Sequence, residues 1–91
     1  MKPVRILIAD DHEVARRGLR ALLESNPRWQ IAGEAANGRE AVDLATRLKP
    51  EIVVLDISMP GLNGLDATRQ ILRDVPSAEV LILSSIAPSR S

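Results

Sequence analysis

The chain has 91 residues, of which 45% are hydrophobic and 26% are charged, a balance typical of one globular domain. Twelve basic residues offset twelve acidic ones, so no basic surface indicates nucleic-acid binding, and the lack of cysteine excludes disulfides and thiolate metal sites. No segment approaches the ~20 apolar residues that a membrane span needs, and acidic residues follow the first apolar run too soon for a signal peptide. We therefore expect a cytoplasmic protein without membrane contact.

The first half of the chain predicts a strand, a helix and a second strand. Residues 4–9 (VRILIA) are apolar and β-branched, as in a buried strand. From residue 13 to residue 24, Ala15, Leu19, Leu22 and Leu23 recur at helical spacing and form the expected core side of a helix. Residues 29–35 (WQIAGEA) alternate and carry polar side chains, which suits an edge strand.

The second half adds a helix followed by a strand, and then another helix followed by a strand. Asn37 followed by Glu40 resembles a capping box at the start of a helix that Pro50 closes. A buried strand follows at 51–55 (EIVVL), then a helix at 65–73 with Leu65, Ile71 and Leu72 as its expected core side. A last strand covers 79–83 (EVLIL). The alternation of strands and helices predicts an α/β fold with a parallel sheet and right-handed crossovers.

Acidic residues end two of the predicted strands. Asp10 and Asp11 follow the first strand, and Asp56 follows the third. Functional groups of open parallel sheets gather beyond the carboxyl ends of the strands, and three crowded carboxylates need a proton or a cation between them. Mg²⁺ fits, because it prefers oxygen ligands and commonly takes one or two carboxylates. The alternative for each acid alone is a helix cap, since aspartate is a common N-cap residue.

Asp56 is then a candidate nucleophile for phosphoryl groups, because carboxylates form acyl phosphates. Ser84, at the end of the fourth strand, offers a hydroxyl at the same edge, or it simply turns the chain. The sequence lacks a GxxxxGK[ST] loop, which excludes a P-loop nucleotidase. It also lacks a second acid two residues after Asp56, which disfavours an aspartyl-phosphate phosphatase.

The stretches IADDHEVARRGLRALLE, VVLDISMPGLNGLDATRQI and VLILSS resemble the receiver domain of bacterial two-component response regulators, especially the subfamily with LuxR-type helix-turn-helix output domains. The resemblance implies a flavodoxin-like fold with strand order 2-1-3-4. It implies that Asp56 is the phosphoacceptor, that Asp10, Asp11, Asp56 and the backbone carbonyl of Ser58 hold Mg²⁺, and that Ser84 contacts the phosphoryl group as a switch. It also implies a histidine kinase or a small phosphodonor as partner.

Family members continue with a helix, a fifth strand and a final helix, and carry a lysine after the fifth strand that contacts the phosphoryl group. The only lysines here are Lys2 and Lys49, each at the wrong end of a strand. We therefore expect residues 1–91 to be a receiver domain truncated after its fourth strand, with no output domain, no direct DNA binding and impaired switching. It would not be an enzyme, beyond self-catalysed phosphoryl transfer.

Other polar residues have simpler interpretations. We expect His12 to be an exposed or partly packed residue at a helix entry, with a ligand or proton donor as the alternative. We expect Arg16, Arg17 and Arg20 to form a solvated helix face. The run Val80–Leu83 instead has the apolar character of a central strand, yet no fifth strand follows it. This predicts a homodimer, joined near the fourth strands or by exchange of elements. The alternative function is a scaffold that assembles with itself or with full-length receivers regardless of phosphorylation.

Overall fold

The computed structural model describes residues 2–57 and 64–83. Their sheet has four parallel strands in the order β2-β1-β3-β4. The strands are β1 (Val4–Ala9), β2 (Trp29–Ala35), β3 (Ile52–Asp56) and β4 (Glu79–Leu83). The helices are α1 (Glu13–Glu24), α2 (Gly38–Leu48) and α3 (Gly64–Asp74). The predicted α/β fold, the predicted element order and the strand order 2-1-3-4 are confirmed.

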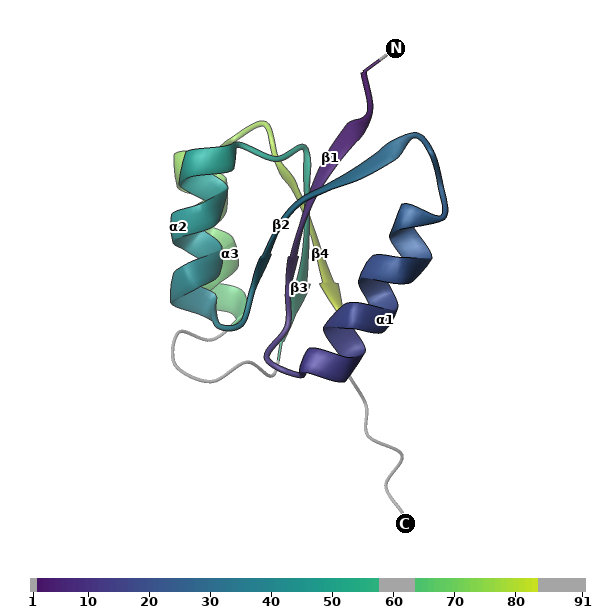
Figure 1. Cartoon of the computed structure of the whole chain (residues 1–91). Coiled ribbons are helices and arrows are strands. Elements are labelled where there is room, and N and C mark those ends of the chain that lie inside the picture. The colour runs from purple at the N-terminus through teal and green to yellow at the C-terminus, as the bar shows by residue number, and fades with distance from the viewer. Residues whose placement is uncertain (1, 58–63, 84–91) are drawn as a thin grey trace.

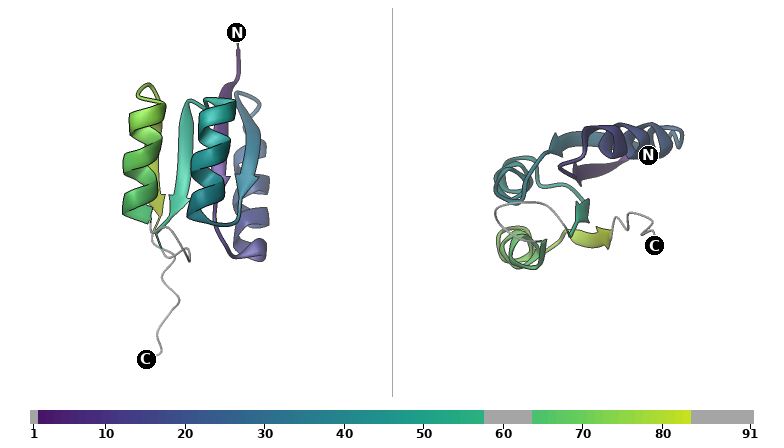
Figure 2. Two further views of the ribbon diagram at one scale, coloured as in Figure 1. Left: turned by 90° about the vertical axis from the view of Figure 1, so that its left-hand side faces the viewer. Right: turned by 90° about the horizontal axis from the view of Figure 1, so that it is seen from below.

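The helices form two unequal layers on the sheet. Helices α2 and α3 lie side by side on one face, and α1 lies on the other (Figure 1). Figure 2 shows the same arrangement from the side and from below. Right-handed crossovers between parallel strands of one sheet produce such layers. None of the helices within 2–57 and 64–83 is long and apolar enough to cross a membrane.

Each face of the sheet has its own hydrophobic core. Under α2 and α3, fully buried Leu7, Leu55 and Ile71 pack with alanines from both helices. Under α1, a smaller cluster contains Ile6, Ile8 and Val54, with Leu19 packed against it. The alanines allow α2 and α3 to lie close to the strands, so a core almost free of aromatic residues still excludes water.

The predicted cap of α2 is present. The Oδ1 of Asn37 accepts a hydrogen bond from the backbone N–H of Glu40 at 2.8 Å, and Glu40 Oε1 accepts one from the N–H of Ala36 at 2.7 Å. The first bond satisfies a backbone donor that a helix start leaves without a partner, and the second ties the chain before the N-cap to the first turn of α2. Helix α2 therefore begins where the sequence predicts.

The predicted core faces of the other two helices were partly wrong. Ala15 and Leu22 in α1 and Leu65 and Leu72 in α3 are exposed, whereas Ala67 and Ile71 are buried. The reason is geometric, because each helix buries only the stripe that faces its neighbours, the sheet for α1 and the sheet with α2 for α3, and leaves the flanking apolar positions in solvent. In α1 only Leu19 and Leu23 pack against the sheet core.

The register between β1 and β2 slips by one residue. Ile6 pairs with Ile31 and Leu7 pairs with Gly33, so Ala32 has no partner across the strand pair. Side chains alternate between the two faces of a strand, and the extra residue reverses the alternation for the rest of β2. Glu34, which pairs with Ile8, therefore lies on the face that α1 covers.

Truncation of Ile71 should destabilise the fold far more than truncation of its neighbour Leu72. Ile71 is 0% exposed and Leu72 is 40% exposed. We expect Ile71→Ala to lower the free energy of unfolding by about 2–5 kcal/mol, since it leaves a cavity, and Leu72→Ala by roughly 0.5 kcal/mol. Urea denaturation measures both, with Ile71→Val as the milder variant if Ile71→Ala does not fold. Equal losses for Ile71→Ala and Leu72→Ala would contradict the observed orientation of α3.

Candidate functional site

The carboxyl ends of β1 and β3 bring two buried acids together. The two strands are neighbours, and Ala9 pairs with Leu55, so Asp10 and Asp56 are the next residues at the same sheet edge. Asp10 is 7% exposed and Asp56 only 2%. Carboxylates are rarely buried to this extent unless a charge or hydrogen bonds compensate them.

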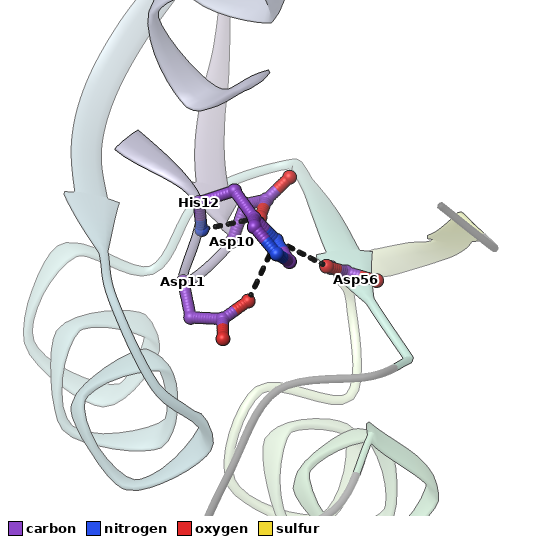
Figure 3. Close-up of side chains that lie close together, drawn as sticks. All are labelled: Asp10, Asp11, His12 and Asp56. Atoms are coloured by element: carbon purple, nitrogen blue, oxygen red, sulfur yellow. Dashed lines mark hydrogen bonds and ion pairs between the residues drawn. The ribbon is translucent and has the colours of Figure 1, made fainter. Parts of the chain in front are cut away.

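Asp11 and His12 complete the group. One ligand atom each from Asp10, Asp11, His12 and Asp56 can be chosen so that all lie within 4.8 Å of one another. The Nδ1 of His12 lies 3.1 Å from Asp11 Oδ1, 3.4 Å from Asp10 Oδ1 and 3.9 Å from Asp56 Oδ2. Figure 3 shows the three carboxylates converging on the imidazole. We call these four residues the acidic cluster.

Backbone bonds hold Asp10 at the end of β1. Its N–H donates to the carbonyl of Ala35 on β2 at 3.0 Å. Its own Oδ1 accepts a hydrogen bond from the N–H of His12 at 2.8 Å, which tightens the turn into α1.

The main chain at Asp56 is held by β4, the strand that lies beside β3 on the side away from β1. Asp56 pairs with Leu83 of β4, and the N–H of the next residue, Ile57, donates to the Leu83 carbonyl at 3.0 Å. At Gly64, a Cβ atom would lie 2.9 Å from the Cα of Ile57, which is too close for a side chain. Because it has no side chain, Gly64 lets α3 begin directly against Ile57, the residue that follows Asp56.

The residues present fit a hard divalent cation. Three carboxylates supply the oxygen donors that Mg²⁺ prefers, and they lie close enough to repel one another without a cation. The Oδ1 of Asp11 is buried and accepts no hydrogen bond within the described part of the chain, although the His12 Nδ1 lies 3.1 Å away. A buried carboxylate oxygen that accepts no hydrogen bond is suited to coordinate a metal ion.

Two predicted site residues cannot be placed. Ser58, whose carbonyl was the fourth expected Mg²⁺ ligand, and Ser84, the expected switch residue, both lie outside the described residues. The remaining predicted residues, Asp10, Asp11 and Asp56, do lie together at one edge.

Sequence reasoning underestimated His12 and two arginines. The His12 side chain is exposed, as expected, but its ring lies against all three carboxylates. The prediction of a solvated arginine face holds for Arg17, which is 75% exposed and pairs with Glu13. It is wrong for Arg16, which is 18% exposed and pairs with Glu34. Arg20 is 43% exposed, as expected, but it also bonds Glu34. The acid on β2 was the only sequence signal for these pairs, and the face of the strand on which it lies was not predictable.

The carboxylate of Glu34 lies between the two arginines. Its Oε1 accepts a hydrogen bond from Arg16 Nε at 2.9 Å, and its Oε2 accepts one from Arg20. The pKa of the Glu34 carboxyl is lowered, chiefly by the hydrogen bond from Arg20; partial burial opposes this effect and Arg16 adds to it. In turn, the hydrogen bond to Glu34 raises the pKa of the Arg20 guanidinium.

The fold and this site define a parallel α/β domain with an acidic cluster at the carboxyl edge of its sheet. The family model of the response regulator receiver domain matches residues 6–90, nearly the whole chain. The chain belongs to this family, and the predicted receiver domain is confirmed.

Individual relatives support the same family assignment. The chain is 42% identical over 82 residues to the transcriptional regulatory protein LiaR of Bacillus subtilis, covering 90% of this chain and 39% of LiaR. It superposes on a LuxR-family two-component response regulator from Aurantimonas with a TM-score of 0.87 and 37% identity, covering 94% of this chain and 61% of that one. It also matches the CheX–CheY–BeF3⁻–Mg²⁺ complex of Borrelia burgdorferi, with a TM-score of 0.86 and 30% identity over 93% of this chain and 64% of that one. The chain thus spans about two fifths of LiaR and about three fifths of these solved chains.

The charge of Glu34 should make stability depend on pH. A lowered folded-state pKa means that the unfolded chain binds the proton more tightly, so the stabilisation is present above the ordinary carboxyl range and lost as pH falls through the lowered pKa. We expect Glu34→Gln to be less stable than the parent at pH 7, with a difference that shrinks in acid. Urea unfolding between pH 7 and pH 3 measures this difference. Glu13→Gln, which removes an exposed ion pair, is the control, and a Glu34→Gln effect independent of pH would contradict the assignment.

Proposed function

We propose that this receiver domain accepts a phosphoryl group on Asp56, from a histidine kinase or from a small phosphodonor. The convergence of Asp10, Asp11 and a 2% exposed Asp56 at one sheet edge is the observation that carries the proposal. Asp56 is the central acid of this group, because it ends the interior strand β3 and faces the turn that carries the other two (Figure 3).

The transfer forms one bond and breaks one. A carboxylate oxygen of Asp56 attacks the phosphorus atom, and the bond between phosphorus and the leaving atom of the donor breaks, with its electron pair going to that atom. The leaving atom is an imidazole nitrogen for the phosphohistidine of a kinase and an oxygen for a small donor such as acetyl phosphate. The product is a mixed anhydride, an acyl phosphate on Asp56. Mg²⁺, when bound, neutralises charge on the transferring oxygens. The carboxylates of Asp10, Asp11 and Asp56 would hold the ion at this edge of the sheet.

Asp10, Asp11 and Asp56 are the proposed side-chain ligands, with the backbone carbonyl of Ser58 as a fourth. Ser84 is the proposed hydroxyl contact to the phosphoryl group, which a hydroxyl can make as a donor. Neither Lys2 nor Lys49 is at this edge, since each precedes the amino end of a strand. The 91 residues by themselves therefore bring no ammonium group to the phosphoryl oxygens, and we expect them to switch weakly on their own.

Incubation with acetyl phosphate and Mg²⁺ tests the phosphoacceptor. We expect intact mass spectrometry to show a single adduct of one phosphoryl group, lost in Asp56→Asn and on removal of Mg²⁺ with a chelator. Asp43→Asn, which changes an exposed acid on α2, is the matched control and should retain the adduct. An adduct that survives in Asp56→Asn would assign the phosphoacceptor elsewhere, and no adduct in the parent would overturn the proposed transfer.

A second candidate function is assembly through β4, independent of phosphorylation. Leu81 is 56% exposed, and Ile82 and Leu83 are also exposed. Strand β4 ends the order β2-β1-β3-β4, so one of its edges pairs with no strand among the described residues. An apolar strand of this kind favours pairing with another chain, and a two-fold arrangement would place two copies of β4 side by side.

Sizing of the purified chain tests this second function. We expect a dimer at micromolar concentration that Leu81→Lys converts to monomer, because the substitution places a charge in the apolar strand. Leu22→Lys, at an exposed apolar position of α1, is the control and should leave the dimer intact. Light scattering that shows a compact parent monomer would contradict assembly through β4, and a dimer unaffected by Leu81→Lys would place the interface elsewhere.

A further inference from the structure

The turn between β1 and α1 carries Asp10 and Asp11, so its backbone sets where two acids of the cluster point. The N–H of Asp10 donates to the carbonyl of Ala35 at 3.0 Å. Its carbonyl accepts a hydrogen bond from Arg16 Nη1 at 2.6 Å. Both peptide groups that flank Asp10 are therefore held, and the second one is the peptide group from which Asp11 begins.

Arg16 reaches this carbonyl from the first turn of α1 and is itself held in place. Its Nε donates to Glu34 Oε1 at 2.9 Å, while Nη1 donates to Asp10. The guanidinium is planar and its donors have a fixed geometry, so one orientation satisfies both acceptors. An arginine bound at two points, with a side chain only 18% exposed, is a fixed part of the turn.

Glu34 gives Arg16 a fixed anchor on the sheet. It lies on β2 opposite Ile8 of β1, and the one-residue slip at Ala32 places it on the face that α1 covers. Its other oxygen is held by Arg20. A chain of contacts thus runs from β2 through Glu34 and Arg16 to the peptide group between Asp10 and Asp11.

We propose that Arg16 and Glu34 are positioning residues for the acidic cluster: Arg16 orients the Asp10–Asp11 peptide group for cation binding, and Glu34 acts through Arg16. The inference rests on the proposed Mg²⁺-dependent function of this site. Groups that orient metal ligands without touching the metal typically alter metal affinity by about 10–100-fold when they are removed.

The sign of the effect separates positioning from simple electrostatics. Arg16 is a cation near three carboxylates, so its charge by itself repels Mg²⁺. If charge alone mattered, Arg16→Gln would bind Mg²⁺ more tightly than the parent. Positioning predicts the opposite, because a misdirected Asp11 removes a ligand.

The test measures the dissociation constant of Mg²⁺ by calorimetry and by amide NMR titration, below the unfolding temperature of every variant. We expect Arg16→Gln to raise it about tenfold, with a nearly normal rate of Asp56 phosphorylation once Mg²⁺ saturates. Arg16→Lys keeps the charge but has one nitrogen for two acceptors, so its dissociation constant should lie between those of the parent and Arg16→Gln. Glu34→Gln should weaken binding in the parent but add nothing in the Arg16→Gln background, because Glu34 acts through Arg16.

Arg20→Gln and Arg17→Gln are the matched controls. Arg20→Gln removes the other partner of Glu34 and should lower the unfolding temperature, yet Mg²⁺ affinity should persist because Arg16 keeps both of its hydrogen bonds. Arg17→Gln removes an exposed ion pair on the same helix and should change neither quantity. If Arg16 only stabilises the fold, Arg16→Gln and Arg20→Gln should lose similar stability and both should bind Mg²⁺ normally. That result would overturn the proposal, and so would tighter Mg²⁺ binding by Arg16→Gln.

A metal-free measurement keeps this inference distinct from the proposed function. In the parent without Mg²⁺, we expect the Arg16 Nε–H to exchange slowly with solvent and Glu34→Gln to shift the amide resonance of Asp11. If the parent shows neither Mg²⁺ binding nor an adduct, the proposed function fails, while these signals still show whether Arg16 and Glu34 hold the turn. If the parent binds Mg²⁺ but Glu34→Gln leaves the Asp11 amide and the Mg²⁺ affinity unchanged, positioning alone fails.

Discussion

Mutual repulsion among three carboxylates is the constraint on which the rest of the structure depends. Asp10 and Asp56 are buried at the ends of neighbouring strands, where their charges are costly without a compensating cation. Backbone hydrogen bonds from the Asp10 N–H to the Ala35 carbonyl and from the Ile57 N–H to the Leu83 carbonyl fix the main chain on which these acids stand. Asp10 and Asp56 therefore start from fixed points at the ends of their strands. A site held in this way suits the divalent cation and the phosphoryl transfer that we propose for it.

The unequal helix layers separate two surfaces with different properties. Helices α2 and α3 cover a continuous core on one face of the sheet, whereas α1 alone covers part of the other (Figure 2). Because Asp56 pairs with Leu83, the exposed apolar strand β4 is directly hydrogen-bonded to the strand that carries the proposed phosphoacceptor. A partner bound at β4 would therefore lie one strand away from Asp56, which is a short physical path between the proposed phosphorylation and the proposed association.

Much of the fold could be predicted from local patterns, and the site only in part. Strand and helix positions followed from apolar periodicity, and the Asn37–Glu40 cap followed from residue types alone. The exposed faces of α1 and α3 were harder, because periodicity shows that a stripe exists but not how wide a stripe the neighbouring layer covers. Leu22 and Leu72 lie just beyond that width. The arginines of α1 looked like one solvated group, and nothing in their spacing distinguishes Arg16 from Arg17.

The sequence by itself determined that acids end two strands of one parallel sheet, because an acid after an apolar run must emerge at the carboxyl edge of its strand. It also determined the family, through motifs that span nearly the whole chain. Only the tertiary structure decided what surrounds those acids. The slip at Ala32 turns Glu34 towards α1, and this in turn brings Arg16 to the Asp10 carbonyl. A register between two strands is set by the packing of both together, so neither strand's sequence contains it alone.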